Sequence, residues 1–237
     1  MPPDSVTVSV IIVTHNSRAA LGDCLKAIPA ACVRYAYEII VIDNRSADDS
    51  LALLRQIRPE ALVVENSANI GFGRACNLAA ESARGEYLLL LNPDAILDPL
   101  AVDHLIDASQ SRDAVGLVVP RLRFPSGTFQ ASCRELPTIG NMMFARQSVI
   151  SKLIAKLFGD SSQYTLPDYS VITSVPSVAG TVALIRRDLF VLAKGFDPRF
   201  FLFMEDTDLC VRLGQSGYEH LFVPTASAVH LWGEGSS

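Results

Sequence analysis

The sequence has few cysteines, and none of them stands in a paired spacing. Its 237 residues contain five, an odd number, and no two are separated by only two residues as in a Cys-x-x-Cys motif. Disulfide scaffolds and structural zinc sites need such regular spacing, so both are excluded. The pattern predicts reduced thiols and a cytoplasmic protein. The cysteines are Cys24, Cys32, Cys76, Cys133 and Cys210.

The sequence also lacks a long apolar run and a basic N-terminal region. Its longest apolar runs, such as 87–91, are the length of a strand, whereas a membrane-spanning helix needs about 18 or more apolar residues. Asp4 stands before the first apolar run, where a signal peptide would carry basic residues. We therefore expect neither a signal peptide nor a membrane span.

Charged residues are scarce and slightly biased toward acids. Only 19% of residues are charged and the net charge is -5, which argues against a nucleic-acid-binding protein. Hydrophobic residues make up 49% of the chain, enough to bury a substantial core. The composition indicates a globular protein that binds no nucleic acid.

Four apolar segments in the first half alternate with amphipathic helical patterns. This order predicts a mostly parallel sheet with right-handed crossovers, flanked by helices, and hence an α/β fold. Ligands of such sheets bind beyond the carboxyl ends of the strands. Each expected strand ends in polar residues, which predicts a binding site at that edge. The strands are 6–13, 38–42, 61–65 and 86–91, and the polar ends are Thr14 with Asn16, Asp43 with Asn44, Asn66 with Asn69, and Asn92 with Asp94.

The second half is less regular. Strands are expected at 115–123, 177–185 and 218–223, and a helix is expected to begin at Glu205. We predict a single domain over 1–237. Within it, the pattern of strands and helices changes near residue 120.

Five motifs in this order resemble the inverting family 2 glycosyltransferases of the GT-A fold, particularly the rhamnosyltransferase-like branch. The resemblance covers nearly the whole chain and implies a GT-A domain that binds a nucleoside-diphosphate sugar. It implies that residues of about 6–120 form the nucleotide-sugar-binding half and residues of about 121–237 the acceptor-binding and catalytic half. The motifs are Val10-Ile11-Ile12-Val13-Thr14-His15-Asn16, Val41-Ile42-Asp43-Asn44-Arg45-Ser46, Asn69-Ile70-Gly71-Phe72-Gly73-Arg74-Ala75-Cys76-Asn77, Leu91-Asn92-Pro93-Asp94, and Gly195-Phe196-Asp197 through Glu205-Asp206-Thr207-Asp208-Leu209.

The resemblance implies that the first two strand ends hold the base and ribose of the donor. Thr14, Asn16, Asp43 and Asn44 would do so, and a carboxylate such as Asp43 can accept a hydrogen bond from a base N–H or a ribose hydroxyl. The alternative is that Asp43 and Asn44 form an ordinary Asx turn after a strand.

The glycine-rich segment after the third strand differs from a dinucleotide-binding fingerprint, which follows a first strand. We expect Asn69, Gly71, Phe72, Arg74 and Asn77 to contribute to donor binding. The glycines would let the backbone approach a diphosphate beside a helix N-terminus, and Arg74 would contact phosphate. A turn without a ligand is the alternative.

Asn92-Pro93-Asp94 stands where the family carries its Asp-x-Asp metal motif. The resemblance makes Asp94 a ligand of Mg²⁺ or Mn²⁺, which prefer oxygen ligands, and makes His230 a further ligand. Asn92 replaces the first aspartate and could instead contact ribose or sugar. A purely structural histidine is the alternative for His230.

The acids that follow the apolar run 200–204 are the candidates for catalysis. An inverting transfer needs a base near the acceptor hydroxyl. The family points to Asp206 as that base, with Glu205 orienting the acceptor or the loop. Gly180 is expected near the donor sugar, where glycine permits close backbone approach, or else in a bulge of a core strand.

These expectations combine into a metal-dependent inverting glycosyltransferase of cell-surface polysaccharide synthesis. The donor would be dTDP-rhamnose or a UDP-sugar, and the acceptor a glycan or a polyprenyl-linked sugar. Two alternatives are a nucleotide-sugar-binding protein without turnover and a nucleotidyltransferase. The second would carry a glycine- and lysine-rich loop after the first strand, where this chain has 14–17.

Residues 139–158 combine apolar positions with Arg146, Lys152 and Lys156 and contain no acid. A basic amphipathic helix can lie on an anionic membrane surface, which would place the protein at the inner face of the plasma membrane. The alternative is an ordinary helix packed over the sheet with its lysines in solvent.

Overall fold

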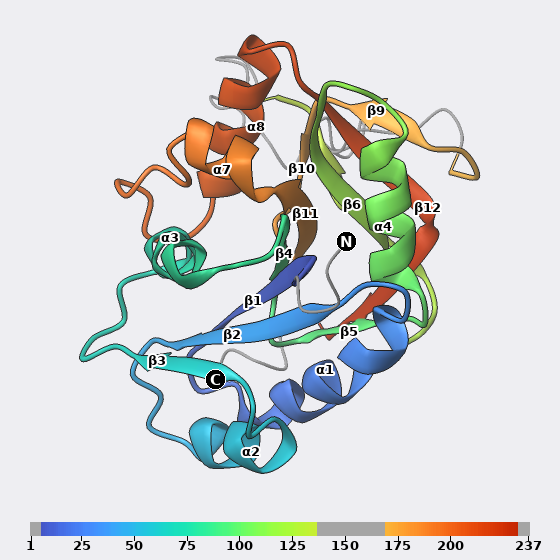
Figure 1. Ribbon diagram of the computed structural model, residues 1–237. Coiled ribbons are helices and arrows are strands. Elements are labelled where there is room, and N and C mark those ends of the chain that lie inside the picture. Colours follow the sequence, from blue (N-terminus) through green and yellow to red (C-terminus); the bar gives the residue numbers. More distant parts are fainter. Residues whose placement is uncertain (1–5, 137–168, 232–237) are drawn as a thin grey trace, which may run out of the picture.

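The computed structural model describes residues 6–136 and 169–231. Strands and helices alternate through the first half, and strands dominate the second (Figure 1). The strands are β1 (Val8–Thr14), β2 (Tyr37–Asp43), β3 (Leu62–Glu65), β4 (Tyr87–Leu91), β5 (Ala95–Leu97), β6 (Val115–Arg123), β7 (Phe129–Gln130), β8 (Cys133–Arg134), β9 (Thr173–Val175), β10 (Ser177–Val178), β11 (Val182–Arg186) and β12 (Glu219–His230). The helices are α1 (Arg18–Ala31), α2 (Ser50–Ile57), α3 (Phe72–Ser82), α4 (Ala101–Gln110), α7 (Arg187–Leu192) and α8 (Glu205–Gln215).

A ten-stranded mixed sheet forms the centre of the molecule. Its main path runs β3-β2-β1-β4-β11-β6-β12-β5, with β7 beside β6 and β9 beside β12. The pairs among β1 to β4 are parallel, as the alternation of strand and helix predicted. Strand β11 runs antiparallel to β4, while β6 and β12 are parallel to each other. A separate small sheet pairs β8 with β10.

Helices cover both faces of this sheet, which makes three layers (Figure 1). Side chains of β1 alternate between the two cores because successive residues of a strand point to opposite faces. Val10 and Ile12 pack with α1, α2 and α4, while Ile11 and Val13 pack with α3, α7 and α8. Both faces are apolar, which explains why β1 is a nearly continuous run of buried residues.

Two of the predicted strands differ from the observed ones. The segment 177–185 is not one strand: β10 and β11 belong to different sheets and are separated by residues 179–181. The chain leaves one sheet for the other at Gly180. The last strand continues beyond Pro224 to His230, because a register shift between Val223 and Ser227 lets β12 pass the proline.

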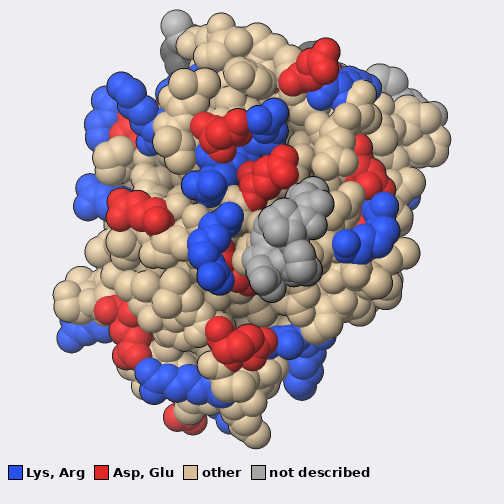
Figure 2. Space-filling view, viewed as in Figure 1, with Lys and Arg blue, Asp and Glu red and all other residues tan. Residues whose placement is uncertain are grey.

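Acidic and basic side chains are interspersed on the face seen in Figure 2, without a large area of one sign. Most arginines of the described residues pair with a neighbouring acid, as Arg84 does with Glu38 and Arg112 with Glu219. In the described ranges 6–136 and 169–231, no helix has the length and apolar character needed to cross a membrane.

A buried histidine joins α8 to the sheet. The ring of His220 is 2% exposed; its Nδ1 accepts the Leu117 N–H at 3.1 Å, and its Nε2–H donates to the Cys210 carbonyl at 3.0 Å. Gly116 makes room for the ring, since a Cβ there would lie 2.9 Å from Nδ1. Burial lowers the pKa of His220 despite the opposing effect of the Cys210 carbonyl.

This lowered pKa predicts a loss of stability in mild acid. The folded state favours the neutral ring, so below the usual histidine pKa of about 6.5 the unfolded chain binds more protons. The contribution of His220 is complete above that pH and is lost as the pH falls toward the lowered pKa. We expect His220→Gln to be less stable than the wild type at pH 7.5 by about 1–3 kcal/mol.

Urea denaturation of both proteins at pH 7.5 and 5.5 measures this effect. The wild type should lose more free energy of unfolding between the two pH values than His220→Gln does. Carboxylates titrate in both proteins and cancel in the comparison. An identical pH dependence in the two proteins would show that His220 does not carry the effect.

Candidate active site

The carboxyl ends of β1 and β2 place Thr14 and Asp43 beside each other in the sheet register. Both side chains are buried. Asp43 Oδ2 accepts the Ser46 N–H at 2.9 Å, whereas Asp43 Oδ1 and Thr14 Oγ1 have no hydrogen-bond partner in the structure as described. Buried polar atoms without partners are costly, and donors from a ligand would remove that cost. The geometry therefore fits the predicted base and ribose site.

The loops next to these two strand ends are held together by amide side chains. Asn16 Oδ1 accepts the Ala47 N–H at 2.7 Å, which connects the loop after β1 to that after β2. Asn44 Nδ2 donates to the Gly71 carbonyl at 3.2 Å, and Asn69 Oδ1 accepts the Gly71 N–H at 3.0 Å. Asn44 and Asn69 thus shape the loop that precedes α3. The predicted donor-binding residues that follow β1, β2 and β3 are connected by these hydrogen bonds.

Gly71 is required where this loop meets the apolar run 200–204. Its φ is 86°, and a Cβ would lie 2.2 Å from the Phe201 carbonyl oxygen. The Phe72 N–H donates to the same carbonyl at 3.1 Å. Two motifs about 130 residues apart in the sequence therefore meet at backbone distance.

Arg74 and Asn77 of α3 face the segment that leads to α8. Arg74 Nε donates to the Pro198 carbonyl at 2.8 Å. The side-chain amide of Asn77 donates to the Phe196 carbonyl at 2.8 Å and accepts the Phe196 N–H at 2.9 Å. In this structure both side chains position the segment 195–198, a role that sequence reasoning did not foresee.

Asp94 and His230 face each other at one end of the sheet. Strand β5 pairs antiparallel with β12, with Ala95 opposite His230, so Asp94 Oδ1 lies 3.4 Å from His230 Nε2. Asn92 precedes this pair; its N–H donates to the Thr181 carbonyl at 2.9 Å. The structure thus brings together the two predicted metal ligands, although they lie 136 positions apart in the sequence.

Gln130 of β7 orients the histidine of this pair. His230 Nδ1 lies 3.1 Å from Gln130 Oε1, so the amide holds the ring with Nε2 toward Asp94. An imidazole nitrogen and a carboxylate oxygen that face each other are both atoms that a divalent cation can take as ligands. Within the described residues no group of three His, Cys, Asp or Glu side chains could hold a metal ion. The pair fits part of a divalent-metal shell that phosphate and water oxygens would complete.

Asp206 lies in the first turn of α8, against the connection between β10 and β11. The Gly180 N–H donates to Asp206 Oδ2 at 3.0 Å, and the Thr207 N–H donates to Asp206 Oδ1 at 2.7 Å. A Cβ on Gly180 would be 3.5 Å from the Asp206 Cβ and 3.9 Å from the Phe72 ring. The carboxylate is therefore fixed beside the loop that precedes α3. Its remaining lone pairs can accept a proton.

Glu205 is buried, unlike its neighbour, at 5% exposure. Its Oε2 has no hydrogen-bond partner in the structure as described, and burial raises its pKa. The Cβ of Glu205 lies close to Gly73, so the side chain lies between the starts of α3 and α8. Adjacent carboxyl groups with different environments can take different roles. Asp208, by contrast, pairs with Arg212 at 2.8 Å on the same helix.

Sequence reasoning missed Gln130 and Arg134. Nothing in the sequence marks Gln130, because its contact with His230 depends on the pairing of β6 with β7 and β12. Arg134, in β8, lies close enough to Glu205 for its charge to oppose the rise that burial causes in the pKa of that carboxyl. A single arginine outside any motif carries no distinguishing pattern.

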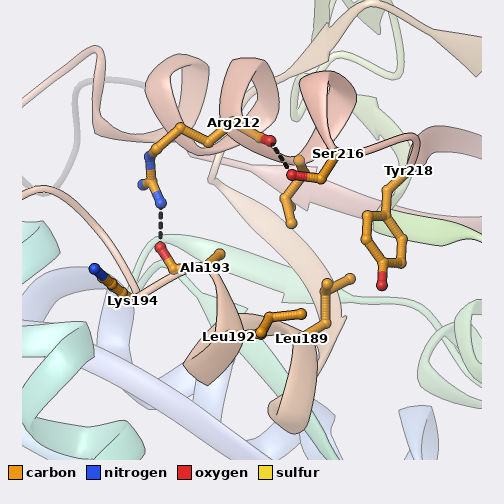
Figure 3. Close-up of a pocket in the computed structure, with 8 residues that line it drawn as sticks. Leu189, Leu192, Ala193, Lys194, Arg212, Ser216 and Tyr218 are labelled. Atoms are coloured by element: carbon orange, nitrogen blue, oxygen red, sulfur yellow. Dashed lines mark hydrogen bonds between the residues drawn. The ribbon is translucent and has the colours of Figure 1, made fainter.

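A surface pocket between α7 and α8 contains none of the predicted site residues. Figure 3 shows Arg212 reaching from α8 to the Ala193 carbonyl, with Leu189, Leu192 and Tyr218 on the pocket wall. Lys194 lies at the same pocket. The candidate active site is instead the set of loops at the strand ends. The predicted amphipathic helix at 139–158 lies outside the described residues.

The fold resembles solved glycosyltransferases. One is GalNAc-T7 with UDP, GalNAc and Mn²⁺, at a TM-score of 0.70 and 18% identity over 97% of this chain. Another is a mannosyltransferase of Pyrobaculum calidifontis with GDP-Man and Mn²⁺, at a TM-score of 0.63 and 20% identity over 97% of this chain. The chain spans 44% and 58% of these two proteins. These likenesses show that the chain has the GT-A fold.

Sequence comparisons identify the family. The N-acetylglucosaminyl-diphospho-decaprenol L-rhamnosyltransferase of Mycobacterium tuberculosis is 28% identical, covering 93% of this chain and 75% of that protein. The rhamnosyltransferase WbbL of Escherichia coli is 29% identical, and the match covers 94% of this chain and 83% of WbbL. The model of glycosyl transferase family 2 matches residues 9–191. The chain belongs to glycosyl transferase family 2, as the motifs implied, and is similar to its rhamnosyltransferases.

Proposed function

We propose that the protein transfers rhamnose from dTDP-rhamnose to a lipid-linked glycan acceptor, with inversion at the anomeric carbon. The facing pair of Asp94 and His230, at the end of the sheet predicted to bind the donor, is the observation that carries the proposal. The rhamnosyltransferase relatives support the sugar, and the decaprenol-diphosphate relative supports the acceptor class. The role proposed for the enzyme is in cell-surface polysaccharide synthesis.

The two halves of the chain would divide the work. Residues 6–120 would hold the nucleotide through Thr14, Asp43 and the loop before α3, and residues 121–237 would supply the acceptor site and the base. A metal ion held by Asp94 and His230 would offset charge on the diphosphate. Reduced thiols favour a reaction on the cytoplasmic side of the membrane.

Asp206 is the proposed base. Its carboxylate would accept the proton of the acceptor hydroxyl while that oxygen attacks the anomeric carbon and the nucleoside diphosphate leaves from the opposite face. The Gly180 and Thr207 N–H groups donate to the carboxylate and hold it in place. Glu205 would keep the start of α8 next to α3.

Thermal unfolding with a panel of nucleotides tests the donor site. A ligand that binds only the folded state raises Tm by mass action, so dTDP or dTDP-rhamnose with Mg²⁺ or Mn²⁺ should raise it more than either component alone. A stronger response to UDP or a UDP-sugar would replace dTDP-rhamnose as the donor. If no nucleotide raises Tm at millimolar concentration, the donor-site proposal is wrong. Binding without product formation would favour a nucleotide-sugar-binding protein.

A further inference from the structure

Arg134 is connected to the proposed base, Asp206, through the strand pair of β8 and β10. It belongs to β8, which pairs with β10 so that Arg134 stands opposite Ser177. The chain then runs from β10 through Gly180, whose N–H donates to Asp206. Arg134 and the proposed base therefore border the same short segment, 177–180.

Among the described residues, most arginines pair with an acid, whereas the guanidinium of Arg134 has no anionic partner there. Across 6–136 and 169–231 it makes no hydrogen bond or ion pair, although its side chain is only partly exposed. Burial raises the pKa of Glu205 and that of Cys210, and the charge of Arg134 opposes both shifts, which places the guanidinium close to the start of α8. An unpaired, partly buried cation beside candidate catalytic acids is suited to binding an anionic group of a substrate.

An exposed apolar loop immediately precedes the same acids. We define the apolar loop as residues 201–204. Phe201 is 57% exposed, Leu202 52%, Phe203 69% and Met204 39%. Large apolar side chains side by side in solvent usually mark a binding surface.

The backbone of the apolar loop is strained at two consecutive positions. Phe203 has φ 67° and Met204 has φ 72°, in a region that residues other than glycine rarely adopt. The Phe201 carbonyl is tied to the Phe72 N–H, and α8 begins at Glu205, so the loop is fixed at both ends. Strain that keeps apolar side chains in solvent next to acids indicates function rather than packing.

We propose that Arg134 and the apolar loop together hold one amphiphilic acceptor, a sugar linked through a diphosphate to a long hydrocarbon chain. Arg134 binds the diphosphate, the apolar loop contacts the first part of the chain, and the sugar hydroxyl reaches Asp206 between them. This assignment rests on the proposed function, because it names the groups that recognise the acceptor of that same reaction. The positive charge matches the diphosphate, and the apolar loop continues directly into the acids.

Farnesyl diphosphate is a suitable probe, since it carries both groups but no sugar. Titration calorimetry would use the full chain, with the donor site saturated by dTDP and Mg²⁺ so that the probe cannot occupy it. The wild type should bind farnesyl diphosphate at least about tenfold more tightly than farnesol, because charge-assisted hydrogen bonds contribute to only one of the two. Equal binding of both, or no binding, would overturn the proposal.

Variants separate the two parts of the proposed site. Arg134→Gln should weaken binding of farnesyl diphosphate about 10- to 100-fold. The affinity of Arg134→Lys should lie between those of the wild type and Arg134→Gln. The double variant Leu202→Ser with Phe203→Ser should bind farnesyl diphosphate more weakly than the wild type does. The wild type should bind farnesyl diphosphate more tightly than the shorter isopentenyl diphosphate, and the double variant should bind the two equally. Lys194→Gln and Leu192→Ser, an exposed cation and an exposed leucine at the α7–α8 pocket, are the matched controls and should bind as the wild type does.

Two further results would contradict the assignment. If Arg134→Gln binds the probe unchanged, the diphosphate lies elsewhere. If the double variant loses binding to phosphatidylcholine vesicles but not to farnesyl diphosphate, the apolar loop contacts a bilayer and not the acceptor. A failure of the donor proposal is seen as an unchanged Tm with all nucleotides, whereas a failure here is seen as an unchanged affinity of the variants for the probe, so the two failures are distinguishable.

Discussion

Replacing Asp206 with asparagine is expected to lower kcat by about 10²- to 10⁴-fold, the usual contribution of a general base. The amide cannot accept the proton of the acceptor hydroxyl. Its oxygen can still accept a hydrogen bond from the Thr207 N–H, so the start of α8 keeps its geometry. Steady-state transfer from dTDP-rhamnose measures the change in kcat.

Donor binding and a neighbouring acid provide the controls for Asp206→Asn. The rise of Tm with dTDP and Mg²⁺ should be unchanged, because Asp206 is not assigned to the donor or the metal. Asp208→Asn removes a charge two residues away that pairs with Arg212, and it should keep kcat within a few-fold. If Asp206→Asn retains more than about a tenth of the activity, the base is another group.

Removing the Asp94 carboxylate is expected to abolish the effect of metal on nucleotide binding. Asp94→Ala leaves His230 without its facing group and deprives a divalent cation of a protein oxygen ligand. Metal stabilisation of a leaving diphosphate amounts to several kcal/mol, so kcat/KM should fall by about 10²- to 10⁴-fold. Thermal unfolding with dTDP, with and without Mn²⁺, measures the binding part of this effect.

Further substitutions at the same pair refine that result. His230→Ala should weaken the response to metal in the same direction. Gln130→Leu should have a smaller effect, since that side chain only orients the histidine ring. Asp23→Asn removes an exposed carboxylate on α1 and is the control for loss of charge alone. An undiminished response to Mn²⁺ in Asp94→Ala would rule out this pair as the metal site.

Much of the fold follows from local patterns. The alternation of buried strands and amphipathic helices predicted the parallel order of β1 to β4, and the polar strand ends predicted the edge where Thr14 and Asp43 meet. The strand at 177–185 was wrong, because periodicity cannot show that a strand leaves one sheet for another at Gly180. Likewise Pro224 indicated the end of a strand that in fact shifts register and continues.

The fold class, the family motifs and the chemical types at the candidate site could be predicted from the sequence, because these depend on residue identity and short spacing. Which side chains face one another became known from the three-dimensional arrangement. It placed His230 opposite Asp94, Gln130 behind that histidine, and Asp206 against the Gly180 amide. These contacts join residues far apart in the chain through strand pairing and helix packing, which short-range patterns do not specify.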